Sequence, residues 1–428
     1  MHFATFFSFW GFFPFGKTIL PVIFIFRHNV MKEVLRKKKI FRWPGGYAAV
    51  VLSISWILCV KAIYCSARAD EAQYRIYHDR DSPGHADTGA DAGDSLLLMF
   101  WNLENFFDYR DQGTGSSDAE FSSSGQRKWT KSRFYTKCNA IAKTFLWIGD
   151  EYGRMPDMAG FAEIENRSVL NALLYSTALR KYDYGIVHYD SPDTRGIDVA
   201  LVYRKGVFRK VRSRPVRVGM YHTDSRDSVS GAHAFRTRDI LYVALEHVAG
   251  DDAAGQDSCA GSHRIEYHML VNHHPSKYGG AAVSVPKREA AMKMMLAVCD
   301  SLDDAGCRNV ICMGDFNDTP DSPLFDFTGK RLVNMAVPLF DRGQGTIRYR
   351  GKRDLIDMFI VSEDVARVSG MEICRVPFLT VWDNSFAGEK PFRTYSGPRY
   401  IGGVSDHCPI LLKIHTAGKR PVTAGAAL

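Results

Sequence analysis

The sequence predicts an α/β fold in which two packed β-sheets are flanked by helices. Short apolar runs with strand character recur throughout residues 96–414, whereas helical periodicity is confined to three stretches. No internal repeat is visible. Many strands with few helices between them are typical of two sheets packed face to face with helices outside.

The expected elements follow from the positions of these runs. The expected strands are 96–101, 158–164, 184–188, 199–203, 240–245, 265–271, 310–313, 355–361 and 409–414. The expected helices are 133–148, 168–179 and 287–302. In the last of these, Ala291, Met294, Met295 and Val298 form an apolar stripe, which indicates core packing. Residues 109–131 are predicted to form a loop that could border a site. Residues 250–262 are predicted to form a second, polar loop.

The positive charge of the chain is confined to its N-terminal part. The formal net charge is +8, but residues 1–66 alone hold nine Lys or Arg and one Glu. The remainder is therefore balanced, with 46 basic and 46 acidic residues. The overall pI of about 8.9 thus gives no evidence for a basic, nucleic-acid-binding body.

Residues 1–66 have the layout of an export signal or membrane anchor. A basic run at 37–39 precedes the apolar run 45–60, and we favour Met31 as the biological start. An uncleaved anchor of about 20 residues is the alternative, which would attach the protein to a membrane. We expect a polar linker at 67–95, one domain at 96–415 and a tail at 416–428. The body should be periplasmic, extracellular or anchored outside the cytoplasm.

The cysteines give no metal-binding spacing. Seven cysteines follow the N-terminal segment 1–66, and no two of them form a CxxC motif. Cys312 and Cys408 lie in strand-like runs and are expected to be buried thiols. A Cys299–Cys307 bridge is conceivable in an oxidising compartment, and the sequence leaves it open.

Polar residues end the predicted strands, and they share one kind of chemistry. These acid, amide and imidazole residues are Asn102, Glu163, His273, Asp315, Asn317, Asp357, Asp406 and His407. A single Asp at a strand end is usually a turn or cap, but so many in one chain indicate a site on a rigid scaffold. Carboxylate and amide oxygens suit Mg²⁺ or Mn²⁺ rather than zinc, and imidazoles supply donors to developing negative charge. The set therefore predicts metal-assisted hydrolysis of a phosphate ester.

The same residues stand in motifs that resemble those of the endonuclease/exonuclease/phosphatase superfamily. The motifs, in family order, are N-L-E-N at 102–105, A-E-I-E-N at 162–166, R-G-I-D-V-A-L-V-Y-R at 195–204, N-H-H-P-S at 272–276, G-D-F-N at 314–317, I-D at 356–357 and S-D-H-C-P at 405–409. That superfamily contains pancreatic-type DNases, abasic-site endonucleases, sphingomyelinases and inositol-polyphosphate phosphatases. The resemblance implies a four-layer α/β sandwich of two mainly antiparallel sheets flanked by helices, with the site at one edge.

The resemblance also implies a role for each motif residue. Metal binding falls to Asn102 and Glu163 with help from Asp406, and Glu104 could add a carboxylate. Asp315 would orient or deprotonate water, and Asn317 would bind the phosphate. His407, paired with Asp357, would stabilise the transition state. His273 would be a second imidazole, with Asp198 as its expected orienting partner.

Substrate contacts are expected from Arg195, Asp198, Arg399 and Tyr400. The segments 393–395 and 399–400 could hold substrate phosphates or could brace the loop, and both alternatives stay open. His274, where many relatives carry Trp or Leu, has either a metal role or a surface or stacking role. The motifs of the inositol-phosphatase subgroup are absent, and basic DNA-clasping loops are not evident.

These observations predict an exported, Mg²⁺- or Mn²⁺-dependent phosphodiesterase, with nucleic acid as the first expected substrate and phospholipid as the second. A phosphomonoesterase or a sphingomyelinase-like enzyme on the same scaffold is the alternative. A binding module without activity is disfavoured, because every expected catalytic position holds a competent residue. We expect a monomer and infer no protein partner.

The charge asymmetry predicts which side of the membrane the body occupies. Basic residues at 37–39 should hold the N-terminal side in the cytoplasm and carry the body across. Protease added to intact cells or spheroplasts should therefore degrade the body. A body that is degraded only after lysis would contradict the predicted export.

Overall fold

A computed structural model of the protein describes residues 95–113, 115, 117–219, 236–248, 265–277 and 280–416. The N-terminal segment 1–66, nearly all of the linker, the polar loop at 250–262 and the tail beyond 416 lie outside the described residues. Those expectations stay predictions. Within the described part of the chain, no helix is both long enough and apolar enough to cross a membrane.

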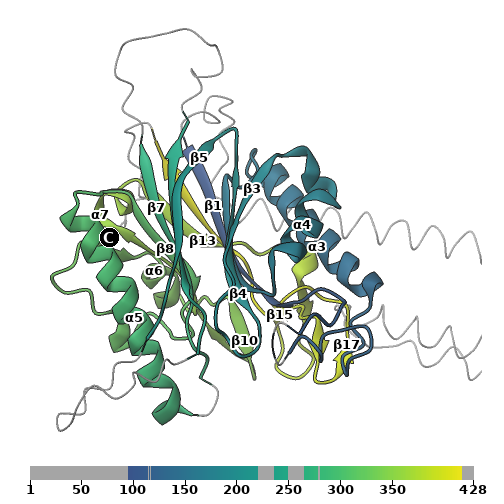
Figure 1. Cartoon of the computed structure of the whole chain (residues 1–428). Coiled ribbons are helices and arrows are strands. Elements are labelled where there is room, and N and C mark those ends of the chain that lie inside the picture. Colours follow the sequence, from purple (N-terminus) through teal and green to yellow (C-terminus); the bar gives the residue numbers. More distant parts are fainter. Residues whose placement is uncertain are drawn as a thin grey trace, which may run out of the picture. The chain divides into compact units, whose positions relative to one another are not determined.

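Two six-stranded sheets form the centre of the fold (Figure 1). The first contains, in spatial order, β13 (Ser369–Ile373), β18 (Ile410–His415), β1 (Ser95–Phe106), β2 (Met158–Ile164), β4 (Asp198–Arg204) and β3 (Tyr184–His188). The second contains β5 (Phe208–Val216), β6 (Ile240–His247), β7 (Glu266–His273), β8 (Val310–Asp315), β12 (Asp357–Ser362) and β9 (Leu332–Asn334). Within these sheets only β1–β2 and β7–β8 pair in parallel.

Helices cover the outer faces, so the predicted four-layer sandwich is confirmed (Figure 1). Helices α3 (Lys131–Glu151) and α4 (Arg167–Tyr175) pack on the first sheet, and α5 (Ala281–Asp304) packs on the second. Helix α4 begins where the Asn166 side chain accepts hydrogen bonds from two backbone N–H groups of the first turn. The smaller elements are α6 (Val337–Asp341), α7 (Glu363–Ala366), β10 (Ile347–Tyr349), β11 (Lys352–Asp354), β14 (Thr380–Trp382), β15 (Glu389–Pro391), β16 (Tyr395–Ser396) and β17 (Arg399–Tyr400).

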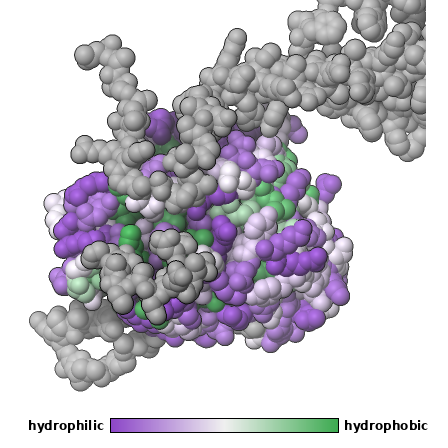
Figure 2. Space-filling model, turned by 90° about the horizontal axis from the view of Figure 1, so that it is seen from above, coloured by the Kyte–Doolittle hydropathy of each residue, from purple (hydrophilic) through white to green (hydrophobic). Residues whose placement is uncertain are grey.

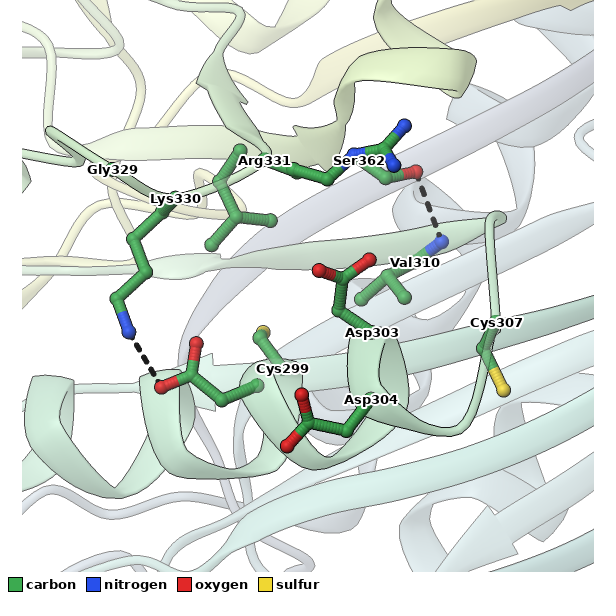
Figure 3. A pocket seen from close by; sticks show the side chains of 11 residues that line it. Cys299, Asp303, Asp304, Cys307, Val310, Gly329, Lys330, Arg331 and Ser362 are labelled. Atoms are coloured by element: carbon green, nitrogen blue, oxygen red, sulfur yellow. Dashed lines mark hydrogen bonds and ion pairs between the residues drawn. The ribbon is translucent and has the colours of Figure 1, made fainter.

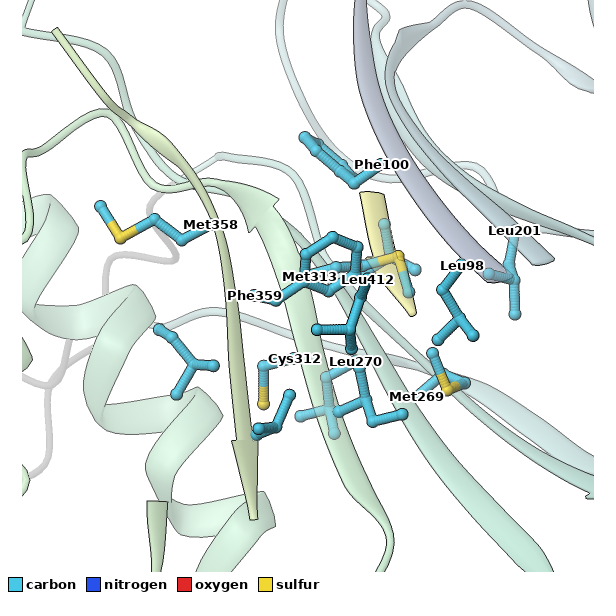
Figure 4. Packing of buried hydrophobic residues seen from close by; sticks show 14 of the residues in the cluster. Leu98, Phe100, Leu201, Met269, Leu270, Cys312, Met313, Met358, Phe359 and Leu412 are labelled. Atoms are coloured by element: carbon cyan, nitrogen blue, oxygen red, sulfur yellow. The ribbon is translucent and has the colours of Figure 1, made fainter. Parts of the chain in front are cut away.

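The core explains why the central strands are continuously apolar. In β1, Leu98 and Phe100 face the second sheet, while Met99 and Trp101 face the helices on the other side. Both faces of the strand are therefore buried, so apolar residues do not alternate with polar ones. Figure 4 shows the cluster between the sheets, to which Leu98 and Phe100 belong together with Met313 of β8. The face of the molecule in Figure 2 is mostly hydrophilic, with apolar side chains in small groups.

The nine expected strands are present, and the strands not predicted lie at the edges of the two large sheets or in three two-stranded sheets. Strand β5, which the sequence analysis did not predict, is an edge strand with mostly exposed, basic side chains. Charged edge strands protect a sheet from further pairing and carry little apolar signal. Strand β13, also not predicted, is a short edge strand. The helix expected at 168–179 is interrupted, because α4 ends at Tyr175 and a 3₁₀ turn follows at Ala178–Lys181.

The predicted burial of Cys312 and Cys408 is confirmed, and both are free thiols. The Sγ atom of Cys299 lies 3.5 Å from Sγ of Cys312. Cys307 is also a free thiol, so the structure contains no Cys299–Cys307 bridge.

Candidate active site

Three neighbouring strand ends of the second sheet bring predicted site residues together. Parallel pairing of β7 with β8 places His273 opposite Asp315. Antiparallel pairing of β12 with β8 places Asp357 opposite the same Asp315. All three side chains are buried, so the sheet register itself assembles an imidazole and two carboxylates in a row.

The first sheet contributes Asn102 and Glu163, each of which lies where the register of strand pairing shifts. The registers of β1 and β2 shift between Asn102 and Phe106 and between Ala162 and Ile164. At this bulge Glu163 has a φ of 62°, a left-handed conformation that is unusual for a residue with a side chain. The Asn105 N–H donates to Oε2 of Glu163 at 2.6 Å. Backbone outliers of this kind cluster at functional sites, where they aim a side chain.

Two glycines allow the strands to approach closely just before these polar ends. A Cβ atom on Gly160 of β2 would lie 2.4 Å from Sδ of Met313 on β8. A Cβ atom on Gly314 of β8 would lie 2.5 Å from the carbonyl oxygen of Asn272 on β7. A side chain at position 314 would collide with the β7 backbone and separate β7 from β8, whereas one at position 160 would require the flexible Met313 side chain to move.

The Asp315 carboxylate lies at the centre of the cluster. Its Oδ2 accepts a hydrogen bond from Nδ2 of Asn102 at 3.0 Å. The same oxygen lies 3.8 Å from Nε2 of His273 and 3.8 Å from Nε2 of His407. Burial, with the charge of Asp357, raises the pKa of Asp315 to about 7, although His407 and Asn102 oppose that shift. Asp315 is therefore a carboxylate of unusual basicity between two imidazoles.

The two imidazoles differ in charge near neutral pH. Nδ1 of His407 lies 2.7 Å from Oδ2 of Asp357. Burial alone would lower the pKa of His407, but Asp357 outweighs it and raises that pKa well above the usual value. Burial, Arg238 and Arg195 lower the pKa of His273 well below its usual value. Hence His407 is cationic and His273 neutral, an arrangement that separates acid and base roles.

The segment before β18 fixes His407 against β1. The Ser405 hydroxyl donates to the backbone oxygen of Asn102 at 2.6 Å and accepts from the His407 N–H at 3.0 Å. The Trp101 indole N–H donates to the His407 carbonyl at 2.9 Å. The serine of the S-D-H-C-P motif is thus an anchor for the imidazole that follows it.

Asp406 and Asn317 lie at the margin of the cluster. Asp406 is 38% exposed, and its Oδ1 lies 3.9 Å from Nε2 of His407. The Asn317 N–H donates to Oδ1 of Asp315 at 2.9 Å, and its Nδ2 donates to the carbonyl of His274 at 3.0 Å. With a φ of 52°, Asn317 forms a tight turn directly after β8. The eight expected catalytic and metal residues therefore lie in one cluster.

Glu104 is engaged differently from the expectation that it joins a metal shell. Its Oε1 accepts from Nε and Nη2 of Arg393 at 3.2 and 3.1 Å, and its Oε2 accepts from the Thr394 N–H at 2.8 Å. The buried Lys137 ammonium donates to the Glu104 carbonyl at 2.6 Å and to Oγ1 of Thr394 at 3.0 Å. Both carboxylate oxygens of Glu104 thus hold the loop at 392–404. Sequence reasoning missed Lys137, whose signal is a lysine on the apolar face of an amphipathic helix.

The predicted pairing of Asp198 with His273 is wrong. Oδ2 of Asp198 lies 3.0 Å from Nε2 of His188, and its Oδ1 accepts from the Ser191 N–H at 2.9 Å. Asp198 starts β4 and reaches the neighbouring β3, so it holds the β3–β4 hairpin together. Both oxygens therefore make contacts within the hairpin, and the substrate contact expected of Asp198 stays a prediction.

The other expected substrate residues are split between two places. Arg195 is 39% exposed, and its charge helps to lower the pKa of His273, so it lies near the centre. Tyr400 instead packs against Tyr395, with ring centroids 5.5 Å apart, and under the Arg133 guanidinium at 4.3 Å. Arg399 is exposed beside it, and no described contact joins either residue to the central carboxylates. For Tyr400 the structure therefore shows a bracing position within the loop.

His274 is buried, so the surface alternative for it is wrong, and the stacking alternative agrees with its position. Its ring meets Phe316 edge to face at a centroid distance of 4.9 Å. Burial, with Arg238 and Arg288, lowers the pKa of His274 to about 3. The neutral ring is a packing element behind Asn317.

The donor set at the centre fits a hard divalent cation. Asp315 and Asp357 each offer a carboxylate oxygen within 4.8 Å of each other, whereas cationic His407, which belongs to the same group, has no lone pair to offer. Oε1 of Glu163 lies 3.9 Å from Nε2 of His273, and this carboxylate is partly exposed. Crowded carboxylates in a buried place favour a cation that neutralises them, and oxygen donors suit Mg²⁺ or Mn²⁺. His188, Asp190 and Asp198 form a second acidic and imidazole group.

Asn102 joins the carboxylates rather than presenting a free oxygen. Its Oδ1 accepts from the Glu104 N–H at 2.9 Å, and its Nδ2 lies 3.5 Å from Oε1 of Glu163 in addition to its bond to Asp315. In this arrangement Asn102 is a positioning residue, and its metal contact stays a prediction.

A cavity of about 380 Å³ lies elsewhere, at the C-terminal end of α5 (Figure 3). It is lined by Cys299, Asp300 and Lys330 among others, and Nζ of Lys330 lies 2.6 Å from Oδ2 of Asp300. The cavity borders the first residue of β8 and the last of β12, whereas Asp315 and Asp357 occupy the opposite ends of those strands. It is therefore separate from the cluster.

A buried carboxylate between two imidazoles, at the edge of two packed sheets, is the arrangement that the sequence predicts for hydrolysis of phosphate esters. The chain belongs to the Endonuclease/Exonuclease/phosphatase family, whose model matches residues 97–416. That match covers the two sheets and every residue of the cluster. None of the curated proteins matches the chain.

Several solved structures are similar to this chain at low identity. The human Nocturnin catalytic domain with bound sulfate is 15% identical, with a TM-score of 0.42, and the match covers 75% of this chain and 93% of that one. A mannosyl-6-phosphatase from Bacteroides thetaiotaomicron is 14% identical, with a TM-score of 0.43 and coverage of 74% and 98%. D. rerio TDP2 complexed with single strand DNA product is 13% identical, with a TM-score of 0.42 and coverage of 75% and 99%.

The contact between His407 and Asp357 predicts that the two act as one unit. His407→Ala should lower the hydrolytic rate by about 10²-fold or more, because a preorganised donor to the transition state is lost. Asp357→Asn should lower it similarly, because the imidazole loses the carboxylate that keeps it charged. Steady-state rates of the double variant should fall well short of the product of the two effects. Fully multiplicative effects would show that the two residues act independently, and wild-type rates in both single variants would show that neither acts in the reaction.

Proposed function

We propose that the protein is an exported phosphodiesterase, dependent on Mg²⁺ or Mn²⁺, that cleaves nucleic acid by attack of water on phosphorus. The observation that carries this proposal is the position of Asp315 between a cationic His407 and a neutral His273. A base with a pKa of about 7 is matched to proton removal from water at neutral pH.

The side chains suggest how the reaction would proceed. Asp315 would accept a proton from the attacking water while a new P–O bond forms on the phosphorus. The bond to the leaving oxygen breaks on the opposite side, and the leaving oxygen takes its electron pair. The His407 imidazolium would stabilise the negative charge on the phosphoryl oxygens, and Asn317 and His273 would position the phosphate through their N–H groups.

Glu163 and Asp406 are the best candidates for holding the cation, because both carboxylates border the cluster and are partly exposed. A bound Mg²⁺ or Mn²⁺ would polarise a phosphoryl oxygen and offset charge on the leaving oxygen. Asn102 would keep Glu163 and Asp315 apart at a constant spacing, because its amide lies between them.

Exposed aromatic rings on the β10–β11 and β14–β15 hairpins support a nucleic-acid substrate. Tyr349 of β10 is 66% exposed and Trp382 of β14 is 62% exposed, on two hairpins that contact each other through Arg348. The Arg350 guanidinium lies 5.3 Å above the Tyr349 ring. The β10–β11 hairpin leads directly into Asp357. Single strands bind to proteins by stacking bases on such rings beside basic side chains.

The same rings favour one second candidate, a phospholipid phosphodiesterase. Trp and Tyr side chains flanked by Arg also suit the interface of a bilayer. A panel of plasmid DNA, RNA, bis(p-nitrophenyl) phosphate, a phosphomonoester and sphingomyelin vesicles, each with Mg²⁺, separates the candidates. Preferred hydrolysis of nucleic acid supports the proposal, and preference for the vesicles or the monoester would overturn the proposed substrate.

Glu163 provides the sharpest test of the metal role. Glu163→Gln should preserve folding, because the two residues have the same shape. It should lower hydrolysis of bis(p-nitrophenyl) phosphate by at least about 10²-fold, because the anionic ligand is lost and metal stabilisation amounts to several kcal/mol. Rates should be measured at saturating Mg²⁺, with Glu151→Gln on the exposed end of α3 as the matched control. A near-normal rate for Glu163→Gln would show that the metal assignment is wrong.

A further inference from the structure

Arg393 is fixed at the rim of the cluster by a buried carboxylate. Its Nε and Nη2 atoms contact Oε1 of Glu104 at 3.2 and 3.1 Å. The Glu104 side chain is 5% exposed, whereas the Arg393 side chain is 50% exposed. Among the described residues, no group accepts a hydrogen bond from Nη1 of Arg393. Arg393 is therefore anchored on one side and free to bind on the other.

The Arg393 guanidinium lies close to the reacting centre. Nη2 of Arg393 lies 3.1 Å from Oδ2 of Asp406, and Oδ1 of Asp406 lies 3.9 Å from Nε2 of His407. One carboxylate thus separates the guanidinium from the imidazole that is expected to contact the scissile phosphate. A guanidinium held in one geometry binds an oxyanion with little loss of side-chain entropy.

We propose that Arg393 determines specificity by binding, through Nη1, a second phosphate of the substrate next to the scissile one. The inference rests on the proposed function and narrows its substrate class. A nucleic-acid strand presents a phosphate next to each scissile bond, whereas an isolated phosphodiester presents none. Guanidinium groups recognise phosphate oxygens through charge-assisted hydrogen bonds, so the second phosphate should raise the affinity of the substrate.

Matched chromogenic substrates test the proposal in the full chain with Mg²⁺. The first pair is thymidine 5′-(p-nitrophenyl phosphate) with and without a 3′-phosphate, and the second is thymidine 3′-(p-nitrophenyl phosphate) with and without a 5′-phosphate. The scissile bond and leaving group are the same within each pair. The wild type should favour the extra phosphate in at least one pair by about tenfold or more in kcat/KM, as for one charge-assisted hydrogen bond.

Two variants separate binding from bracing. Arg393→Lys keeps a positive charge beside Glu104 but loses the second arm, so the ratio of kcat/KM between the two members of each pair should fall to near one, whatever change in rate is common to both members. Arg393→Ala should lose the preference as well. Arg209→Ala removes an arginine that is also at least half exposed and pairs with Glu246 on the β5 edge, so it should keep the preference.

Binding of unreactive ligands gives a second readout. Calorimetric affinities for thymidine 3′,5′-bisphosphate and thymidine 5′-phosphate should differ in the wild type and converge in Arg393→Lys. The inference would be overturned if the Arg393 variants lost kcat/KM equally for both members of every pair, or if the preference survived in both variants. The proposed function would then still stand. If the protein hydrolysed none of these substrates and no other phosphodiester, both the inference and the proposed function would be overturned.

Discussion

The cost of burying the Asp315 carboxylate is the constraint on which this site depends. Asp315 lies where the two sheets meet and is 2% exposed, and an ionised group there is unfavourable unless neighbours compensate. Asn102 donates one hydrogen bond from the other sheet, and the Asn317 N–H donates a second. Cationic His407 adds favourable charge, but Asp357 nearby opposes ionisation. The balance leaves Asp315 able to gain and lose a proton near neutral pH.

The geometry of the fold follows from that balance. Donors can reach Asp315 only if the strand ends of both sheets converge. Gly160 lets β2 approach Met313 of the second sheet, and Gly314 lets β8 lie close to its neighbour β7. The bulge at Glu163 then brings a third carboxylate to the same edge. Beyond it, Arg393 and Lys137 offset the negative charge on the side of the 392–404 loop. Positive charge at the rim and negative charge at the centre suit a substrate that is anionic and a cation that joins the two.

Much of the site could be predicted because its residues end apolar strands. His273 and Asp315 end central strands, Asp357 begins one, and Asn102 stands just before the register shift within β1. The order of strands in a sheet brings these positions together. The charge states of the imidazoles follow from burial and from partners far apart in sequence. His407, for example, depends on a carboxylate 50 residues away.

Other features leave too weak a trace in the sequence. Glu104 and Arg393 are 289 residues apart in the sequence. Their contact therefore leaves no periodic pattern of apolar residues from which it could be predicted. Asp198 resembles a catalytic residue by its motif, yet its carboxylate holds a hairpin partner ten residues away. Strand β5 is basic and lies at a sheet edge, so its sequence lacks the apolar alternation that marks a strand. Local sequence patterns therefore predict the core strands and the polar residues at their ends. The pairing of charged groups depends on tertiary contacts, which these patterns do not predict.

The most direct measurement of the central claim is the position of a bound cation. A crystal of the protein grown with Mn²⁺ should show an anomalous difference peak at the edge where the sheets converge. The peak should lie about 2.0–2.2 Å from a carboxylate oxygen of Glu163 and on the same side of the cluster as Asp315 and His407. A peak only at the group formed by His188, Asp190 and Asp198, or no peak at Glu163, would contradict this account of the site.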